Sequence, residues 1–157
     1  MTKFKLIVFL KATYELILVF LQFSIIALHF FQWELLPKKQ IIQVTTISYF
    51  MGILIIIIAF IIMLVAMKDL GRNLSPFPRP ITNSNLVTTG IYGFLRHPMY
   101  YSLIIFSFGF FIIKLSIYYL CLSISLFLII KLKIVLEENY LKNKFRNYFL
   151  YKNEFKY

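Results

Sequence analysis

The stretch IIQVTTISYFMGILIIIIAFIIMLVAM, residues 41–67, decides the fold class of this chain, because none of its residues carries a formal charge. As an α-helix it would extend about 40 Å at 1.5 Å per residue, whereas the hydrocarbon core of a bilayer is about 30 Å thick. The chain around it has 157 residues, of which 61% are hydrophobic. One domain of this length cannot bury so much apolar surface, which excludes an ordinary soluble enzyme, a disordered protein and a coiled coil. We therefore expect an integral membrane protein.

Three further apolar stretches complete the expected membrane domain. The first span is expected to begin at about Leu6, with Lys11 and Glu15 spaced four residues apart so that they can pair on one helical face. The apolar sequence over residues 98–130 is too long for one crossing, so we expect a hairpin that turns near Lys114. The predicted fold is all-α and polytopic, with one domain over residues 1–157 and spans at about 6–33, 41–67, 98–113 and 115–132.

Polar segments between the spans set the expected orientation. A short turn is expected at residues 34–40, and a long structured loop at 68–97, where three prolines spaced by two exclude a helix. This loop and the tail, residues 133–157, hold most of the basic residues of a chain whose net charge is +11. Because basic loops remain on the cytoplasmic side, we expect four spans with the loop and both termini in the cytoplasm. This topology explains the positive net charge, so binding to nucleic acid is not needed to account for it.

A first candidate site lies where the long loop meets the third span, at the sequence Arg96-His97-Pro98. Proline suits the first position of a helix, which places His97 at the N-cap beside Arg96. The free N–H groups and the positive dipole end of that helix would favour a carboxylate or a phosphate. In the alternative, Arg96 and His97 only anchor the helix in lipid headgroups, and Tyr92 and Tyr100 belong to an aromatic belt.

A second candidate site lies near the end of the fourth span, at Lys133, Glu137 and Glu138. Adjacent glutamates at this end of a helix oppose the helix dipole, which favours cations there. Lys133 and Glu137 share a face, whereas Glu138 points about 100° away. A salt-bridged, solvated helix end is the alternative. Because the last two spans form a hairpin, both clusters emerge on the same side, and this convergence favours a joint functional site.

The ordered combination of motifs resembles a known family. LVTTGIY begins at Leu86 and RHPMY at Arg96; an apolar hairpin follows, and then EExxL begins at Glu137. This order is similar to that of the isoprenylcysteine carboxyl methyltransferase family, and the related phospholipid N-methyltransferases share much of the same signature. Bacterial members often carry a stretch like NLSPFPRP, which begins here at Asn73. The similarity covers about residues 70–151.

The resemblance implies an enzyme of the membrane, expected to be a bacterial inner membrane, that uses S-adenosylmethionine in a cytosolic pocket closed by the loop and the tail. A lipophilic methyl acceptor would enter this pocket from the bilayer, and neither a nucleic acid nor a metal is expected. The cofactor contacts implied by position are Leu86, Val87, Tyr92, His97, Pro98, Met99, Tyr100 and Glu137. The implied catalytic residues are Arg96, Lys133 and Glu138, of which Lys133 stands where the family has an arginine that handles the substrate carboxylate.

The expected reaction is carboxyl O-methylation of an isoprenylcysteine-like acceptor. A carboxylate is already deprotonated, so transfer would depend on alignment and desolvation more than on a base. Lys133 lacks the bidentate fork of arginine, and the tail is one residue shorter than the family pattern. The alternatives are N- or S-methylation of a phospholipid or a small molecule, an NADPH-dependent membrane reductase, and a non-enzymatic membrane scaffold.

Overall fold

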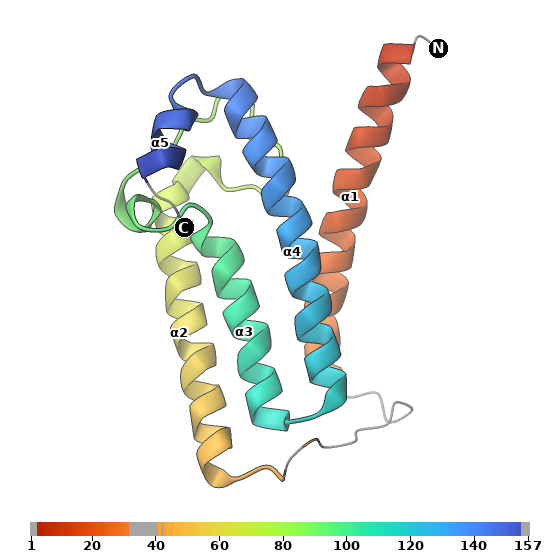
Figure 1. Cartoon of the computed structure of the whole chain (residues 1–157), viewed down its shortest axis with the longest axis vertical. Helices are drawn as coiled ribbons and strands as arrows, with labels where there is room; N and C mark the ends of the chain where they lie inside the picture. The colour runs from red at the N-terminus through yellow and green to blue at the C-terminus, as the bar shows by residue number, and fades with distance from the viewer. Residues whose placement is uncertain (1–2, 32–40, 42, 155–157) are drawn as a thin grey trace.

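The computed structural model describes residues 3–31, 41 and 43–154, and within them the chain is all-α (Figure 1). Its helices are α1 (Lys3–Phe30), α2 (Thr46–Leu70), η1 (Gly71–Asn73), η2 (Gly90–Gly93), α3 (Pro98–Lys114), α4 (Ile117–Lys144) and α5 (Tyr148–Glu154). Three stretches of the described chain are long and apolar enough to cross a membrane: Lys5–Phe30, Thr46–Asn73 and Ile117–Lys144. α3 is a shorter apolar helix. The predicted all-α polytopic membrane class is confirmed.

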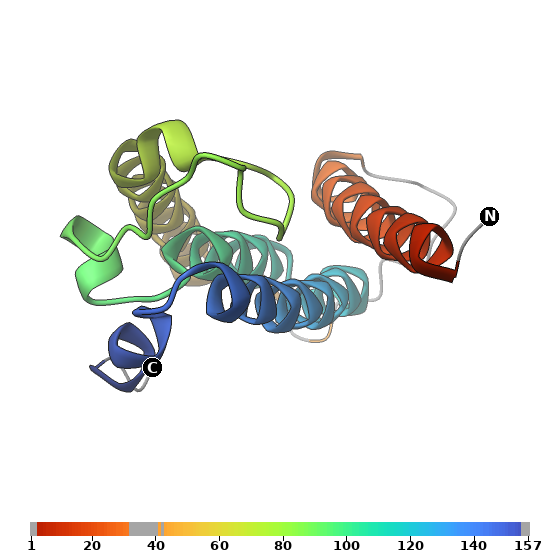
Figure 2. The same ribbon diagram turned by 90° about the horizontal axis from the view of Figure 1, so that it is seen from above.

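The long helices alternate in direction, so the start of α1, the long loop between α2 and α3, and α5 lie at one end of the bundle (Figure 1). α3 packs between α2 and α4, and α1 packs mainly against α4. Seen from above, α1 stands apart from α2, with part of the long loop between them (Figure 2). The predicted hairpin of α3 and α4 is confirmed: Leu115 ends α3 in the left-handed conformation, and Ser116 caps α4.

Local capping explains where the helices differ from the expected spans. α2 begins at Thr46, several residues after the expected start, because Thr45 and Ser48 form a capping box. The backbone N–H of Ser48 donates to Thr45 Oγ1 at 3.1 Å, and that of Thr45 donates to Ser48 Oγ at 3.0 Å. α4 continues well past residue 132 to Lys144. The turn predicted at 34–40 and the end of the first span lie outside the described residues, and the limits of the spans stay a prediction.

Small residues allow α2 and α3 to approach closely. A Cβ atom added at Gly52 of α2 would lie 2.8 Å from the carbonyl oxygen of Gly109 in α3, and one added at Gly109 would lie 3.1 Å from that of Gly52. Ala59 and Ala66 are also buried on α2. Small-residue contacts of this kind are typical of helix pairs in membranes. The contact of Gly52 with Gly109 brings the second half of α3 close against α2.

α1 is attached to the bundle near its C-terminal end by polar contacts. The buried His29 ring lies 2.7 Å from Ser107 Oγ of α3 through Nε2, and 2.8 Å from the carbonyl oxygen of Ile25 through Nδ1. The hydroxyl of Tyr118 in α4 donates to the carbonyl of Leu28 at 3.1 Å. Within an apolar bundle such contacts satisfy polar groups that lipid could not. They fix α1 at the end of the bundle opposite the long loop.

Candidate functional site

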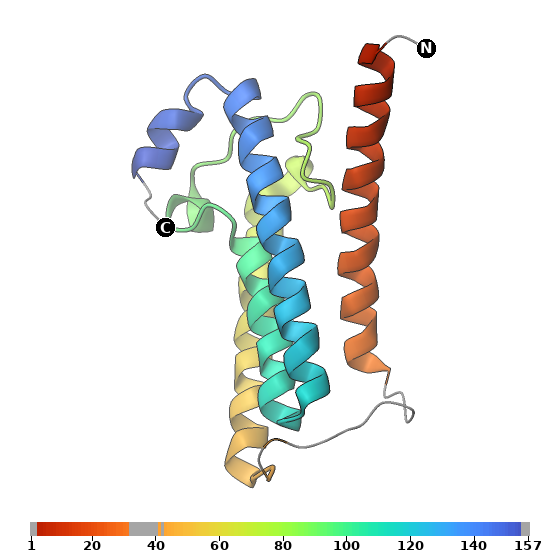
Figure 3. The same ribbon diagram turned by 45° about the vertical axis from the view of Figure 1, so that its right-hand side comes forward.

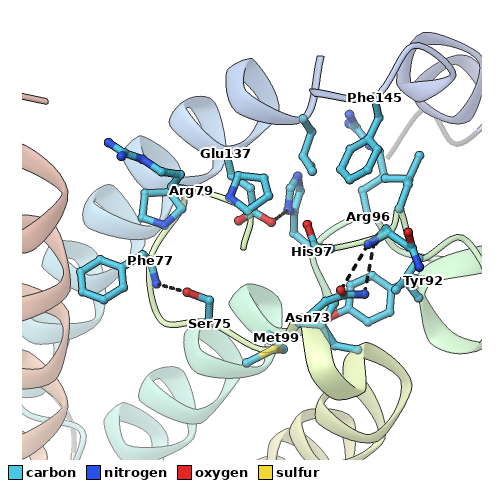
Figure 4. A pocket seen from close by; sticks show the side chains of 18 of the residues that line it. Asn73, Ser75, Phe77, Arg79, Tyr92, Arg96, His97, Met99, Glu137 and Phe145 are labelled. Atoms are coloured by element: carbon cyan, nitrogen blue, oxygen red, sulfur yellow. Dashed lines mark hydrogen bonds and ion pairs between the residues drawn. The ribbon is translucent and has the colours of Figure 1, made fainter. Parts of the chain in front are cut away.

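A cavity opens at the end of the bundle that carries the long loop (Figure 4). The cavity is half-open, and the empty space in it and in its mouth together is about 790 Å³. Its walls come from the long loop, the start of α3, the end of α4 and the C-terminal segment. Residues far apart in the sequence therefore surround one space.

Most of the residues that the family resemblance implicates in cofactor binding line this cavity. They are Leu86, Val87, Tyr92, His97, Met99, Tyr100 and Glu137. Pro98 is not part of the wall; it is buried at the first position of α3, directly behind His97. Of the three residues expected to be catalytic, Arg96 lines the cavity, whereas Lys133 and Glu138 do not.

His97 joins the two predicted clusters. It is the N-cap of α3, as its place before Pro98 predicts, and its side chain is buried. Its Nδ1 lies 4.0 Å from Glu137 Oε1, and its Nε2 lies 3.7 Å from Glu138 Oε1. The His97 ring also stacks on Tyr100, with ring centroids 5.8 Å apart. Although buried, Nε2 has no hydrogen-bond partner among the described residues.

Glu138 connects the cavity wall to the C-terminal helix. One carboxylate oxygen lies 2.5 Å from Arg96 Nη1, and the other lies 2.5 Å from Lys152 Nζ of α5. Glu138 is thus neutralised by two cations and faces them, which explains why it does not line the cavity. Such charge-assisted contacts between partly buried groups hold side chains in a defined position.

Two tyrosines of α5 complete this attachment. The hydroxyl of Tyr151 donates to the backbone carbonyl of Tyr92 at 2.6 Å, and Tyr148 is almost fully buried beside it. Burial raises the pKa of Tyr148 to about 12, and burial likewise raises the pKa of Tyr151 to about 12. Both hydroxyl groups are therefore neutral at physiological pH. α5 covers the side of the cavity formed by η2, where Tyr151 itself lines the wall.

Lys133 lies beneath the long loop, away from the cavity. Only 1% of this residue is exposed. Its ammonium donates to the side-chain oxygen of Gln22 in α1 and, at 2.9 Å, to the carbonyl oxygen of Pro76 in the loop. It also lies 5.3 Å from the centroid of the Tyr100 ring. The nitrogen expected to hold a substrate carboxylate therefore binds α1 and the loop in this structure.

The prediction that Glu15 can pair with Lys11 is wrong in this structure. The carboxylate of Glu15 instead accepts from Arg79 Nη2 of the long loop at 3.2 Å, and from the hydroxyl of Tyr140 in α4. Lys11 is exposed, whereas Glu15 faces the bundle and is only 5% exposed. A buried carboxylate requires such partners. A glutamate within an apolar span was the available sequence signal for these contacts.

Polar contacts hold the long loop in place on the cavity. Asp69 accepts from the backbone N–H of Ile91 at 2.8 Å, at the start of η2. Gly90 has φ +62° there, and a Cβ atom would lie 2.1 Å from Asp69 Oδ2, so this position requires glycine. Near the middle of the loop, Lys144 donates to the carbonyl of Thr82 at 3.0 Å and to Ser84 Oγ at 2.7 Å. The loop is therefore an ordered wall.

Comparison with known proteins assigns the segment that forms these walls to one protein family. The family model described as phospholipid methyltransferase matches residues 47–148, which is more than half of the chain. The match extends from α2 to the start of α5, and it includes the long loop and both candidate clusters. The comparisons with curated proteins and with solved structures give no match. The chain belongs to the phospholipid methyltransferase family, and it is a membrane methyltransferase related to the isoprenylcysteine carboxyl methyltransferases.

Proposed function

We propose that this protein uses S-adenosylmethionine to methylate a lipophilic acceptor that reaches the cavity from the bilayer. One observation carries the proposal. In a chain of a methyltransferase family, the long loop, the start of α3 and the end of α4 bring His97, Tyr100 and Glu137 to one cavity. Glu137 is 40 residues from His97 in the sequence, and the two side chains lie side by side only in the fold.

The residues of the cavity suit the chemical groups of the cofactor, which supplies an electrophilic methyl group on a sulfonium. The start of α3, beside Arg96, suits a carboxylate. The Glu137 carboxylate, whose side chain is 28% exposed, can accept hydrogen bonds from an ammonium or from ribose hydroxyls. The ring of Tyr92 in the wall can offer a face to a cation.

The chain itself would contribute alignment and the exclusion of water. Methyl transfer is an in-line displacement, so the rate depends on holding the acceptor opposite the departing sulfur. α5 and the long loop cover the cavity, and burial of Tyr92 raises the pKa of its hydroxyl, which keeps this hydroxyl neutral. In such an enclosure a charged acceptor loses its hydration shell and becomes more reactive.

The contacts of Lys133 favour an amine as a second candidate for the acceptor. A carboxylate acceptor needs a cation beside it, but the ammonium of Lys133 binds Gln22 and Pro76. An amine acceptor must instead lose a proton, and the neighbouring His97 and Glu137 are groups in the cavity wall that can accept one. A phospholipid amine is therefore an alternative to an isoprenylcysteine carboxylate as the methyl acceptor.

Binding and transfer assays test the proposal. We expect S-adenosylhomocysteine to stabilise the detergent-solubilised protein against heat, and NADPH to give no stabilisation. With methyl-labelled S-adenosylmethionine, label should enter either phosphatidylethanolamine or an N-acylated farnesylcysteine in mixed micelles, and Glu137→Gln should abolish it. Lys11→Gln, on the exposed face of α1, is the control. If neither stabilisation nor labelling occurs with the native chain, the proposal is wrong.

We place the cavity end of the bundle in the cytoplasm, because the basic residues of the loop and tail gather there. Cysteine labelling tests this placement. In a Cys121→Ser background, which removes the exposed native thiol, a cysteine introduced at the exposed Lys142 should react with a membrane-impermeant maleimide only after the membrane is opened. Labelling of intact cells would reverse the assignment.

A further inference from the structure

α1 lies outside the segment that matches the family, yet it carries three buried polar side chains that face that segment, and two of them, Glu15 and Gln22, lie on the side of the long loop. Glu15 is 5% exposed and Gln22 is 6% exposed. They are seven residues apart, which is two helical turns, so they share a face. Most other residues of α1 near them are apolar and exposed, as expected for a helix surrounded by lipid. Polar groups buried in such a helix are costly unless they have defined partners.

Each of these side chains joins α1 to both the long loop and α4. Glu15 accepts from Arg79 of the loop at 3.2 Å and from Tyr140 of α4. Gln22 accepts from Lys133 of α4, whose ammonium also donates to the carbonyl oxygen of Pro76 at 2.9 Å. The views from two directions show this part of the loop reaching towards α1 (Figures 2 and 3). Two polar junctions therefore fix the loop at residues 76 and 79.

The loop segment held by these junctions lines one end of the cavity. Phe77, Pro78, Arg79 and Pro80 all belong to the wall. Figure 4 shows Phe77 and Arg79 on the side of α1, while Tyr92 and Arg96 lie on the opposite side. The residues assigned to the cofactor come from the loop after residue 85 and from the helix ends. The end of the cavity beside α1 is therefore left for the acceptor, and its phenyl and prolyl side chains suit an apolar molecule.

We propose that α1 shapes the acceptor end of the cavity, with Glu15 and Gln22 as positioning residues for loop residues 76–80. This inference rests on the proposed function. Neither side chain touches the cavity; both act through the loop. α1 thereby becomes the element that adapts a shared methyltransferase segment to the acceptor of this chain.

Glu15→Leu and Gln22→Leu test the proposal, because each removes the acceptor of one junction and leaves the cavity wall unaltered in sequence. Lys11→Gln is the control, one turn away on the exposed face of α1. Amide hydrogen exchange in the peptide covering residues 74–82 should be about tenfold faster in the two test variants. The dissociation constant of S-adenosylhomocysteine should stay within about twofold of the native value.

Steady-state kinetics provide a second readout. The acceptor in this assay is phosphatidylethanolamine or N-acylated farnesylcysteine, whichever takes the label. Its half-saturating mole fraction should rise about fivefold in each variant. The kcat should remain within about twofold, because the reacting groups are untouched. A role in overall stability alone would not raise one kinetic constant and spare the other.

The possible failures are distinct. If the native chain does not bind S-adenosylhomocysteine, the proposed function is wrong. If it binds, but loop exchange and half-saturation in both variants equal the native values, only the role of α1 is overturned. The role of α1 is also overturned if the dissociation constant of S-adenosylhomocysteine rises as much as the half-saturating mole fraction of acceptor. In that case α1 supports the whole cavity and not its acceptor end alone.

Discussion

The Glu138 carboxylate of α4 lies 2.5 Å from Arg96 Nη1, although the two residues are 42 positions apart in the chain. The second oxygen of the same carboxylate binds Lys152 of α5 at 2.5 Å. One side chain therefore links the loop before α3 to the C-terminal helix. The cavity depends on this link, because both Arg96 and Tyr151 of α5 contribute to its wall.

Lys152→Gln should loosen α5 without disturbing the helical bundle. The substitution removes the cation on α5 but leaves the pair of Glu138 and Arg96 intact. Because Lys152 is one-third exposed, we expect a modest loss, with binding of S-adenosylhomocysteine weakened about fivefold. Isothermal titration calorimetry measures this change, and faster proteolysis near residue 147 should accompany it. Lys142→Gln, at an exposed lysine of α4, is the control; equal affinities in the two variants would contradict the prediction.

Alkaline pH should release α5. The folded-state pKa of both Tyr148 and Tyr151 is raised to about 12, so the neutral hydroxyl is favoured in the docked helix. The stability from this docking is fully present below the ordinary tyrosine pKa of about 10 and is lost as the pH rises towards 12. Tyrosinate absorbance should therefore show two late-titrating groups that disappear in a chain truncated after residue 147. Normal titration of both tyrosines in the native chain would show that α5 is not docked.

Gly90→Ala should impair the cavity far more than Gly71→Ala. Both glycines have positive φ, +62° and +52°, so an alanine is strained at either position whatever the space around it. Only at Gly90 would the new Cβ atom also meet a neighbour, 2.1 Å from Asp69 Oδ2, whereas nothing lies within 4 Å at Gly71. We expect Gly90→Ala to displace η2 with Tyr92 and to weaken binding of S-adenosylhomocysteine more than about tenfold. Comparable affinities for the two variants would argue against a fixed η2.

His97→Asn should separate binding from stability. Asparagine is a preferred N-cap residue, whereas His97 makes no side-chain capping hydrogen bond to α3. The melting temperature should therefore stay equal or rise slightly, while the loss of the imidazole between Glu137 and Glu138 weakens cofactor binding about tenfold or more. Thermal unfolding with and without S-adenosylhomocysteine measures both effects. Unchanged stabilisation by this ligand would remove His97 from the site.

Local rules predicted the parts of the site that depend on neighbouring residues. Pro98 identified the start of α3 and thereby the position of His97, because proline is restricted to the first turn of a helix. The hairpin then implied that Glu137 would lie near His97, which the structure shows at 4.0 Å. These inferences needed only helix geometry and chain direction.

The contacts of α1 could not be predicted in the same way. Glu15 and Arg79 are 64 residues apart, and their pairing depends on how α1 is rotated against α4. Helix geometry alone offered Lys11 as the nearest partner of Glu15. The side chain of Lys133 shares a helical face with Glu137 but lies one turn further into the bundle, about 6 Å along the axis. That displacement places it under the loop, beside Gln22, and outside the cavity.

A double variant decides whether Lys133 serves the acceptor or the fold. Lys133→Met alone leaves the Gln22 side chain and the Pro76 carbonyl without their donor, so we expect the melting temperature to fall by several degrees. Adding Gln22→Leu removes one unpaired group and should restore much of this loss, because two apolar side chains can pack where a buried polar pair stood. If Lys133 is structural, as its contacts indicate, the kcat recovers together with stability in the double variant, while the half-saturating mole fraction of acceptor stays raised because the junction with Pro76 is absent. A double variant that is stable and still inactive would instead show that the Lys133 ammonium acts on the acceptor, and it would favour a carboxylate over an amine.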